Sequence, residues 1–561
     1  MKTLFLALIS LCFVTAAHAQ WQTTTYALKG GWNSIYLHGD ATHATPDELF
    51  AANPEVLEVW RWNPNPSQVQ FISSPLLPTS GLAEWTTWKR DGSVTTLSQL
   101  LGQTAYLVKC SGSSSDSHSV TITQRMLPPS ASWVRNGANL MGFPSSNAGG
   151  SYPSIVNYFA TFPAAIASGV KIYKYVGGEI GPSNPIQVFS PSFEALDRNQ
   201  SYWFDTEVVG NFYAPLEVSL SKAGGLDFGR SGSVITLHLR NRSAAVNTVT
   251  LALVASESAP AGQTAVTGSV PLTLRTYDAN SLSWTVTAIS GSFTQAIAPN
   301  SSVELSIGID RGAMSTDSSA FYASLLRLTD SSNLIDIYLP AQAQVASLAG
   351  LWIGDATVSK VNSKVASSPG STTPRSFPLR YILHLDNAGT ARLLSQVYLG
   401  TLVDEGNPEG ICTKEAGLKA GTKAAAVRMS VAHLPLDSAI TAGSGSVALG
   451  ATLVRNISIP YNSPTNPFVH QYHPDHDNKD ARPDGTNIGL ADGVESYGIS
   501  RQVSFEFTNS PPEGVSSVGW GSTVIGGNYT EVLSGLHKES IRTSGTFILQ
   551  RASENGAITI N

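Results

Sequence analysis

The 561-residue chain has few cysteines, few charged residues and no long apolar run beyond its first residues. Three cysteines occur in all, which excludes a small disulfide-stapled scaffold and requires a fold that rests on hydrophobic cores. Cys12 lies in a leader-like segment, so Cys110 and Cys412 remain for the rest of the chain. Their wide separation places them in different predicted domains, and a bridge between them is not the favoured interpretation.

Charged residues make up 13% of the chain, against roughly 25% in an average soluble domain. Gly, Ser and Thr take their place, a balance typical of β-rich extracellular proteins. The net charge of −6 is small for this length. Because nucleic acids and anionic membranes are bound by basic patches, we expect no nucleic-acid partner.

The N-terminal segment has the pattern of a secretory signal. Lys2 precedes the apolar stretch 4–14, and a small-residue pattern follows it, which predicts a signal peptide at 1–19 that is cleaved after Ala19. The apolar stretch is shorter than the about 20 residues that span a bilayer. We expect an exported protein that is extracellular, at the cell surface or periplasmic, and not an integral membrane protein.

Two stretches of the N-terminal half repeat the same order of motifs. The string "GGWNSIYLHG" matches "NGANLMGFPS", with Asn33 opposite Asn139. Each is followed by a proline-led segment, an alternating aromatic strand pattern and a closing aromatic strand. This order predicts two β-rich repeat units, 20–125 and 126–218. It resembles the tandem "GWN" β-domains of large secreted bacterial proteins.

A short helix is predicted inside the first repeat unit. Thr45 is placed as its N-cap, Pro46 stands in its first turn, and Glu48 is placed to close a capping box.

The region 219–345 consists of short alternating runs separated by Gly, Asn, Ser and Asp, which is typical of a β-sandwich. Within it, "LDFG" followed by "LRN" resembles the immunoglobulin-like domains of bacterial surface proteins. The resemblance implies a spacer or platform module.

The last region, 346–561, contains a series of strand patterns with Gly-rich turns, including a predicted hairpin turn at "LDNAG". These predict an up-and-down barrel or a sandwich. Trp352 in the first strand and Arg551 in the last resemble the lipocalin-like (calycin) pattern. That resemblance implies a floor closed by Arg551 stacked on Trp352 as a cation–π pair. The alternative is a core tryptophan and an exposed arginine.

The segment 466–498 concentrates polar side chains in the string "FVHQYHPDHDNKDARPDG". Imidazole and carboxylate groups together are the ligands that zinc and similar ions prefer. The predicted metal ligands are His470, His473, Asp475, His476 and Asp477. A calcium alternative uses the oxygen donors of Asp475, Asp477, Asn478, Asp480 and Asp484, although Lys479 breaks the EF-hand template. One divalent ion, Zn²⁺ or Ca²⁺, is the cofactor under either hypothesis.

Two other interpretations of this segment stay open. His473, Asp475 and His476 resemble part of the metal-binding signature of metallo-β-lactamase-type hydrolases, with Gln471 in place of its first histidine. No other catalytic motif is found, and no catalytic residue is assigned. Alternatively, the polar side chains hydrogen-bond one another and build a rigid loop over one end of the barrel.

The aromatic residues of the repeat units suit either a sugar-stacking platform or a buried core. We favour the core, because large aromatics carry most of the burial in a β-domain. They are Trp60, Trp62, Trp85, Trp88, Tyr173, Tyr175, Tyr202 and Trp203.

Together these features predict a mainly β, multidomain fold: two tandem β-rich domains, an immunoglobulin-like sandwich and a C-terminal β-barrel or sandwich. The favoured function is an exported binding or structural protein, with no catalytic role, that presents its last domain to an extracellular protein, a glycan or another cell-surface component. The alternatives are a secreted metal-dependent hydrolase that uses the segment 470–484 and a carrier of a small apolar ligand.

Overall fold

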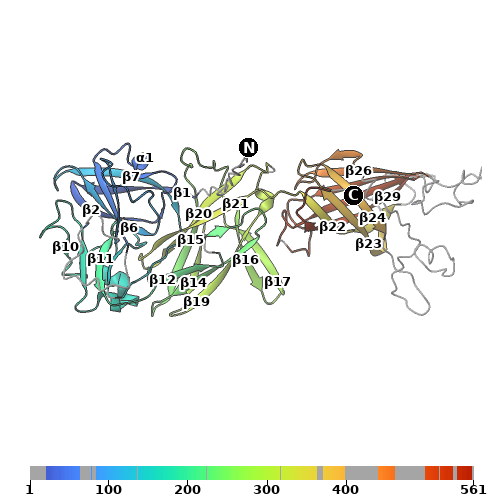
Figure 1. The fold of residues 1–561 in the computed structure, drawn as a ribbon. Coiled ribbons are helices and arrows are strands. Elements are labelled where there is room, and N and C mark those ends of the chain that lie inside the picture. Colours follow the sequence, from blue (N-terminus) through green and yellow to red (C-terminus); the bar gives the residue numbers. More distant parts are fainter. Residues whose placement is uncertain are drawn as a thin grey trace, which may run out of the picture. The chain divides into compact units, whose positions relative to one another are not determined.

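The computed structural model describes residues 20–63, 78, 84–135, 137–222, 224–315, 317–362, 371–398, 440–460, 499–516, 518–534 and 540–558. It is mainly β, as predicted, with several antiparallel sheets (Figure 1). The chain divides into two compact units: unit 1 is Met1–Gly229, Val234–Asp310 and Ser319–Gln344, and unit 2 is Arg230–Ser233, Arg311–Ser318 and Val345–Asn561. This division is coarser than the four predicted domains, whose boundaries remain predictions.

Unit 1 begins with two four-stranded sheets of equivalent topology. The first has the order β2-β6-β4-β5 and the second the order β8-β11-β9-β10. Their strands are β2 (Gly31–Leu37), β4 (Val56–Trp62), β5 (Trp85–Lys89), β6 (Thr104–Cys110), β8 (Gly137–Met141), β9 (Lys171–Lys174), β10 (Ile186–Gln187) and β11 (Tyr202–Thr206). A three-stranded sheet of β1 (Trp21–Lys29), β7 (Ser117–Met126) and β3 (Gly39–Asp40) accompanies the first.

The matched asparagines of the two motifs make the same contacts. The side chain of Asn33 accepts from the backbone N–H of Lys29 at 2.9 Å and donates to its carbonyl at 2.7 Å. Asn139 pairs in the same way with Val134, at 2.8 and 3.1 Å. Each amide satisfies a backbone N–H and C=O just before its strand, so the asparagine fixes the entry of the chain into the sheet.

The helices are short: α1 (Pro46–Leu49), α2 (Ile155–Tyr158) and the 3₁₀ turns η1 (Phe159–Thr161), η2 (Pro163–Ile166) and η3 (Arg311–Ala313). The capping box predicted for α1 is confirmed, because Thr45 accepts from the Glu48 backbone and Glu48 accepts from the Thr45 N–H. Within the described ranges, no helix has the length and apolarity needed to cross a membrane.

The aromatic residues of the tandem sheets are core residues, as favoured from the sequence. Trp60, Trp62, Trp85 and Trp203 are buried in one cluster, with Trp62 and Trp203 ring centroids 5.4 Å apart. Trp88, Tyr175 and Tyr202 are also buried, and Tyr173 packs partly buried against the cluster. The sugar-stacking alternative for these rings is therefore wrong.

The rest of unit 1 consists of two five-stranded sheets. One has the order β12-β14-β19-β16-β17 and the other β13-β21-β20-β15-β18. The strands of the first are β12 (Leu216–Leu220), β14 (Val234–Asn241), β16 (Leu272–Asp278), β17 (Ser283–Ala288) and β19 (Ser302–Ile309). Those of the second are β13 (Leu226–Asp227), β15 (Asn247–Ala255), β18 (Ser292–Ile297), β20 (Phe321–Asp330) and β21 (Asp336–Gln344).

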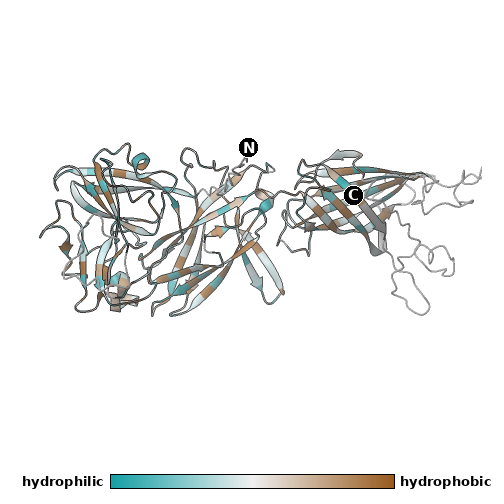
Figure 2. Ribbon diagram, in the orientation of Figure 1, coloured by the Kyte–Doolittle hydropathy of each residue, from teal (hydrophilic) through white to brown (hydrophobic). Residues whose placement is uncertain are grey.

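Unit 2 is a strongly curled eight-stranded half-barrel with the order β24-β23-β22-β29-β28-β27-β26-β25. The strands are β22 (Gly350–Asn362), β23 (Ser371–Leu385), β24 (Ala391–Tyr398), β25 (Gly443–Gly445), β26 (Thr452–Ile459), β27 (Ile499–Phe507), β28 (Val524–Ser534) and β29 (Ile541–Ser553). Hydrophobic and hydrophilic residues interleave along these strands (Figure 2), as expected when one face of a sheet packs on a core.

The two edges of the half-barrel touch at one level. Leu393 of β24 exchanges two backbone hydrogen bonds, of 3.0 and 3.2 Å, with Ile440, which lies just before β25. The Arg455 guanidinium on β26 donates to the Ala391 carbonyl of β24 at 2.7 Å. These contacts satisfy edge groups that would otherwise be open to pairing with another chain.

Candidate functional site

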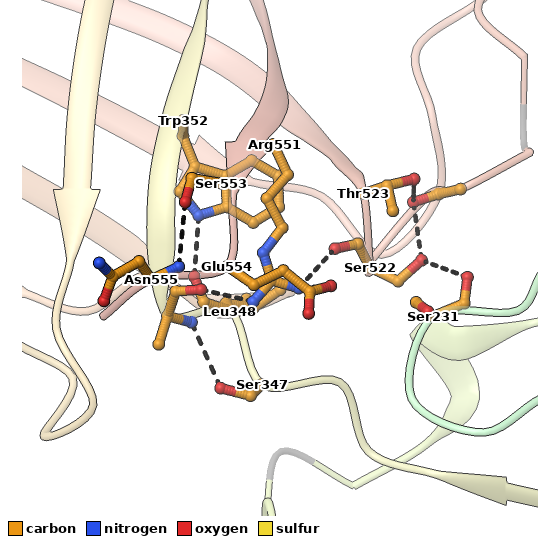
Figure 3. Close-up of polar contacts among 12 residues, drawn as sticks. Ser231, Ser347, Leu348, Trp352, Ser522, Thr523, Arg551, Ser553, Glu554 and Asn555 are labelled. Atoms are coloured by element: carbon orange, nitrogen blue, oxygen red, sulfur yellow. Dashed lines mark hydrogen bonds and ion pairs between the residues drawn. The ribbon is translucent and has the colours of Figure 1, made fainter. Parts of the chain in front are cut away.

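Trp352 of β22 and Arg551 of β29 lie against each other in the half-barrel (Figure 3). The guanidinium carbon of Arg551 lies 5.6 Å from the centroid of the fully buried Trp352 ring. The cation–π pair predicted from the two strand ends is therefore confirmed. The indole N–H of Trp352 donates to the Leu348 carbonyl at 2.8 Å, so the one polar group of this buried ring has a backbone partner.

Arg551 is also fixed by its other contacts. Its guanidinium donates to the Ala349 carbonyl, and it lies 3.5 Å from the Glu554 carboxylate. Burial lowers the pKa of Arg551, and the nearby Glu554 charge opposes this shift. Because the ordinary pKa of a guanidinium lies far above neutrality, Arg551 stays charged at neutral pH and acts as a structural cation beside Trp352.

The core of the half-barrel contains a buried ion pair. Arg501 on β27 donates from Nε to Glu531 on β28, and both side chains are almost fully buried. Tyr529 donates to Glu531 at 2.6 Å, and the hydroxyls of Tyr381 and Tyr529 are 2.7 Å apart. Since Tyr529 gives its proton to the carboxylate, Tyr381 is the donor in that second bond.

The charge states of this network follow from its burial. Burial by itself would lower the pKa of Arg501, but the Glu531 carboxylate together with Tyr381 and Tyr529 outweighs it, and the pKa is raised. Burial raises the pKa of both Tyr381 and Tyr529 above the ordinary value. The network is thus a paired cation and anion with two neutral phenols, which specifies one packing of the core.

Aromatic rings fill the interior at the level of this network. Tyr381 on β23 and Phe505 on β27, separated in the sheet by three strands, have ring centroids 5.0 Å apart. Phe505 and Phe547 are likewise 5.0 Å apart. A carrier of an apolar ligand needs a cavity between such walls, and at this level the opposite walls touch.

A groove of about 500 Å³ lies on the outer face of the half-barrel. Trp352 and Ala356 point into the core, so the side chains that alternate with them on β22 point outward. The groove is lined mainly by outward residues of three neighbouring strands: Ile353, Asp355 and Thr357 of β22, Arg380 of β23, and Thr546, Ile548 and Gln550 of β29. Gly354, Arg551 and Ala552 complete the lining.

The charged groups of the groove are all paired: Asp355 with Arg380, and Arg551 with Glu554, which lies outside the lining. Arg380 and Asp355 are cross-strand partners, with Nε to Oδ1 at 2.5 Å and Nη2 to Oδ2 at 3.2 Å. Both side chains are about two-fifths exposed, so this fork offers free donor and acceptor capacity to a ligand without net charge. Thr357, Thr546 and Gln550 add hydroxyl and amide groups, and the two isoleucines add an apolar floor.

The strand beside the groove is covered by Trp520. Gly526 of β28 pairs with Ile548, and a Cβ at Gly526 would lie 3.1 Å from the Trp520 indole. The indole N–H donates to the Thr508 carbonyl at 3.2 Å. Trp520 therefore takes up the outer face of β28, next to the groove strands.

The metal ligands predicted from the sequence, His470, His473, Asp475, His476 and Asp477, lie outside the described residues, as does Cys412. In the part of the chain that the structure describes, no three His, Cys, Asp or Glu side chains gather as a metal site would require. Cys110 is buried, and burial raises the pKa of its thiol to about 12.

The groove residues were missed in the sequence analysis. The alternation of "WIGDATV" around Asp355 indicates outward positions, but nothing local shows that Arg380 and Gln550 face the same space. Their proximity depends on pairing between strands almost two hundred residues apart in the chain.

Searches against known protein families and against curated proteins give no match for this chain.

Proposed function

We propose that the protein is an exported binding protein whose C-terminal half-barrel holds a neutral, hydroxyl-rich ligand, such as a glycan, on its outer face. The observation that carries this proposal is the groove around the Asp355–Arg380 pair. Export rests on the signal-like N-terminus.

The chemistry of the groove favours a neutral ligand over an anion or a cation. A lone guanidinium would attract anions and a lone carboxylate cations, but Asp355 and Arg380 compensate each other, and the other cation of the lining, Arg551, is only 7% exposed and is paired with Glu554. What remains is a set of hydrogen-bonding groups of both kinds, from Asp355, Arg380, Gln550 and two threonines. Sugar hydroxyls donate and accept equally, and the aliphatic C–H face of a pyranose fits the two isoleucines.

The apolar-carrier alternative has less support, because the interior is packed between Tyr381 and Phe505. The interior ion pair is also unsuited to a ligand site of this kind, since Glu531 already receives Arg501 and Tyr529.

The test is ligand-observed NMR of the mature chain with cellotriose, maltotriose and mannotriose, compared with trigalacturonic acid and chitosan trimer. We expect saturable binding of at least one neutral trisaccharide and weaker binding of the charged ones. The Asp355→Ala/Arg380→Ala double variant, which conserves net charge and removes only a surface pair, should lose this binding and keep its fold. Absence of saturable binding by every neutral trisaccharide, or a preference for a charged one, would refute the proposal.

A further inference from the structure

The β16–β17 hairpin of unit 1 exposes an unusual amount of apolar surface. All six residues of β17 are exposed. Leu282 at the turn is 75% exposed, Trp284 52%, Tyr277 48% and Val286 45%. Isolated exposed apolar residues are common on soluble proteins, but a contiguous group of them marks an interaction site.

Three of these side chains share one face of the hairpin with an arginine. Tyr277 pairs with Trp284, and Arg275 pairs with Val286, so the four lie on the same side of the sheet. The rings of Tyr277 and Trp284 are 5.3 Å apart, and the Arg275 guanidinium lies 4.7 Å from the Trp284 centroid. Trp, Tyr and Arg are the residues that most often dominate binding energy at protein interfaces.

The turn holds its apolar residue in a rigid and unfavourable conformation. Leu282 has a φ of +51°, a region that bulky side chains rarely adopt. The turn is fixed by Asp278, which accepts from the Asn280 N–H and from the Ser281 hydroxyl, both at 2.9 Å. Glycine or asparagine would suit this position better for folding alone, and outliers of this kind gather at binding sites.

β17 is also an edge strand that lacks the usual features that prevent an edge from pairing with another chain. It is last in the order of its sheet and pairs only with β16 among the described strands. Its sequence, "SWTVTA", contains no lysine, proline or acidic residue, and its register with β16 has no bulge. These are the devices by which edge strands avoid pairing with other chains.

The free backbone groups of this edge can be assigned. Ile289 donates its N–H to the Leu272 carbonyl of β16, and N–H groups alternate in direction along a strand. The N–H groups of Trp284, Val286 and Ala288 therefore point away from β16, toward the open edge.

Arg275 supplies a positive charge beside this edge. The Nε of Arg275 makes no hydrogen bond among the described residues, and no charged group is found to act on the pKa of its guanidinium, which burial lowers. The guanidinium stacks on Trp284 and so lies above β17 rather than above its own strand. Neighbouring strands are about 4.8 Å apart, so an added strand would run within its reach.

We propose that β17 is a docking edge for an extended segment of a partner protein, which adds to the sheet as a further strand and places a carboxylate against Arg275. Main-chain bonds to Trp284, Val286 and Ala288 supply affinity, and Tyr277, Trp284 and Leu282 contact the partner's apolar side chains. A second copy of β17 does not fit, because it carries no acidic residue. This site is separate from the groove in unit 2 and does not depend on it.

The test starts from a displayed library of 12-residue peptides selected on the mature full-length chain. Val286→Pro removes one outward N–H without a bond to β16, and Val286→Thr removes only apolar surface. We expect selected peptides with an acidic residue among alternating apolar ones. In fluorescence polarisation, Val286→Pro should weaken them at least about 10-fold, Arg275→Gln about 5-fold, and Val286→Thr less than about 3-fold. Circular dichroism checks the fold, and Val286→Lys, a natural edge guard, replaces the proline variant if that variant unfolds.

Three outcomes would overturn the proposal. The first is that no peptide binds the wild-type chain more strongly than the Val286→Pro chain. A dimer of the wild type that Val286→Pro abolishes in sedimentation would identify a second copy as the occupant. Displacement of the peptides by neutral trisaccharides would identify a glycan as the occupant of this edge.

Discussion

Single buried side chains set much of the local chemistry of this protein. His38 in unit 1 lies 2.8 Å from the Arg198 carbonyl through Nε2. A carbonyl only accepts, so Nε2 carries the proton of a neutral ring. Burial, followed by the Arg198 charge, lowers the pKa of His38 to about 3.

This shift predicts a pH dependence of stability. Between pH 6 and pH 4 the unfolded chain protonates His38 and the folded chain does not, so the free energy of unfolding falls as pH falls. The slope is about 1.4 kcal/mol per pH unit. His38→Gln keeps a donor for the carbonyl and should lack this component.

Urea unfolding followed by tryptophan fluorescence measures the effect, because all tryptophans except Trp352 and Trp520 lie in unit 1. The wild-type stability should fall more steeply with decreasing pH than that of His38→Gln. Parallel pH curves for the two proteins would contradict the assignment.

The buried ion pair of unit 2 predicts that two glutamate substitutions on neighbouring strands change the free energy of unfolding by very different amounts. Glu531→Gln removes the carboxylate that faces the buried Arg501 guanidinium and should cost about 3–5 kcal/mol. Glu506→Gln, on the exposed face of β27, should change stability by less than about 0.5 kcal/mol. Hydrogen exchange of the amides of β27 and β28 gives both values. A cost below about 1 kcal/mol for Glu531→Gln would show that the pair is not needed.

At the scale of elements, the sequence predicts best where a local contact decides the structure. The capping box of α1 needs only Thr45 and Glu48, three residues apart, and it is confirmed. The roles of Asn33 and Asn139 follow from backbone groups four or five residues away. Trp352 and Arg551 lie far apart in the sequence, but their contact could be predicted because one stands near the start of the first strand of unit 2 and the other near the end of the last.

The groove and the exposed hairpin could not be predicted, because both depend on non-local pairing. β22 and β29 shift register at two bulges, one of them at Trp352, and a one-residue slip would turn Asp355 into the core. In β17, Trp284, Val286 and Ala288 alternate with Ser283, Thr285 and Thr287, a pattern that predicts a buried apolar face, so the sequence gives no sign that this strand is an exposed edge.

The segment 466–498 remains an element defined by sequence alone. The metal hypothesis predicts near-stoichiometric zinc or calcium in the purified chain, reduced in the His473→Ala/His476→Ala variant, together with a lower melting temperature in EDTA. The rigid-loop hypothesis predicts no metal in either chain and unchanged melting. Elemental analysis of the two proteins decides between them.

At the scale of the whole molecule, the two proposed binding surfaces lie on two units with separate cores. The tryptophans of unit 1 are buried in its cores, apart from Trp284 on the hairpin. Unit 2 carries its polar groove on the outside of a filled half-barrel. We expect the two surfaces to act independently, since substitutions in separate cores do not share contacts.

The most direct measurement is calorimetric titration of the neutral trisaccharide that binds best into the wild type, Gln550→Ala and Gln502→Ala. Both glutamines are exposed on the outer face of the same sheet, but only Gln550 lines the groove. Loss of one hydrogen bond should weaken binding about 3- to 10-fold in Gln550→Ala, with Gln502→Ala equal to the wild type. Equal affinity in all three proteins would show that the groove is not the binding site.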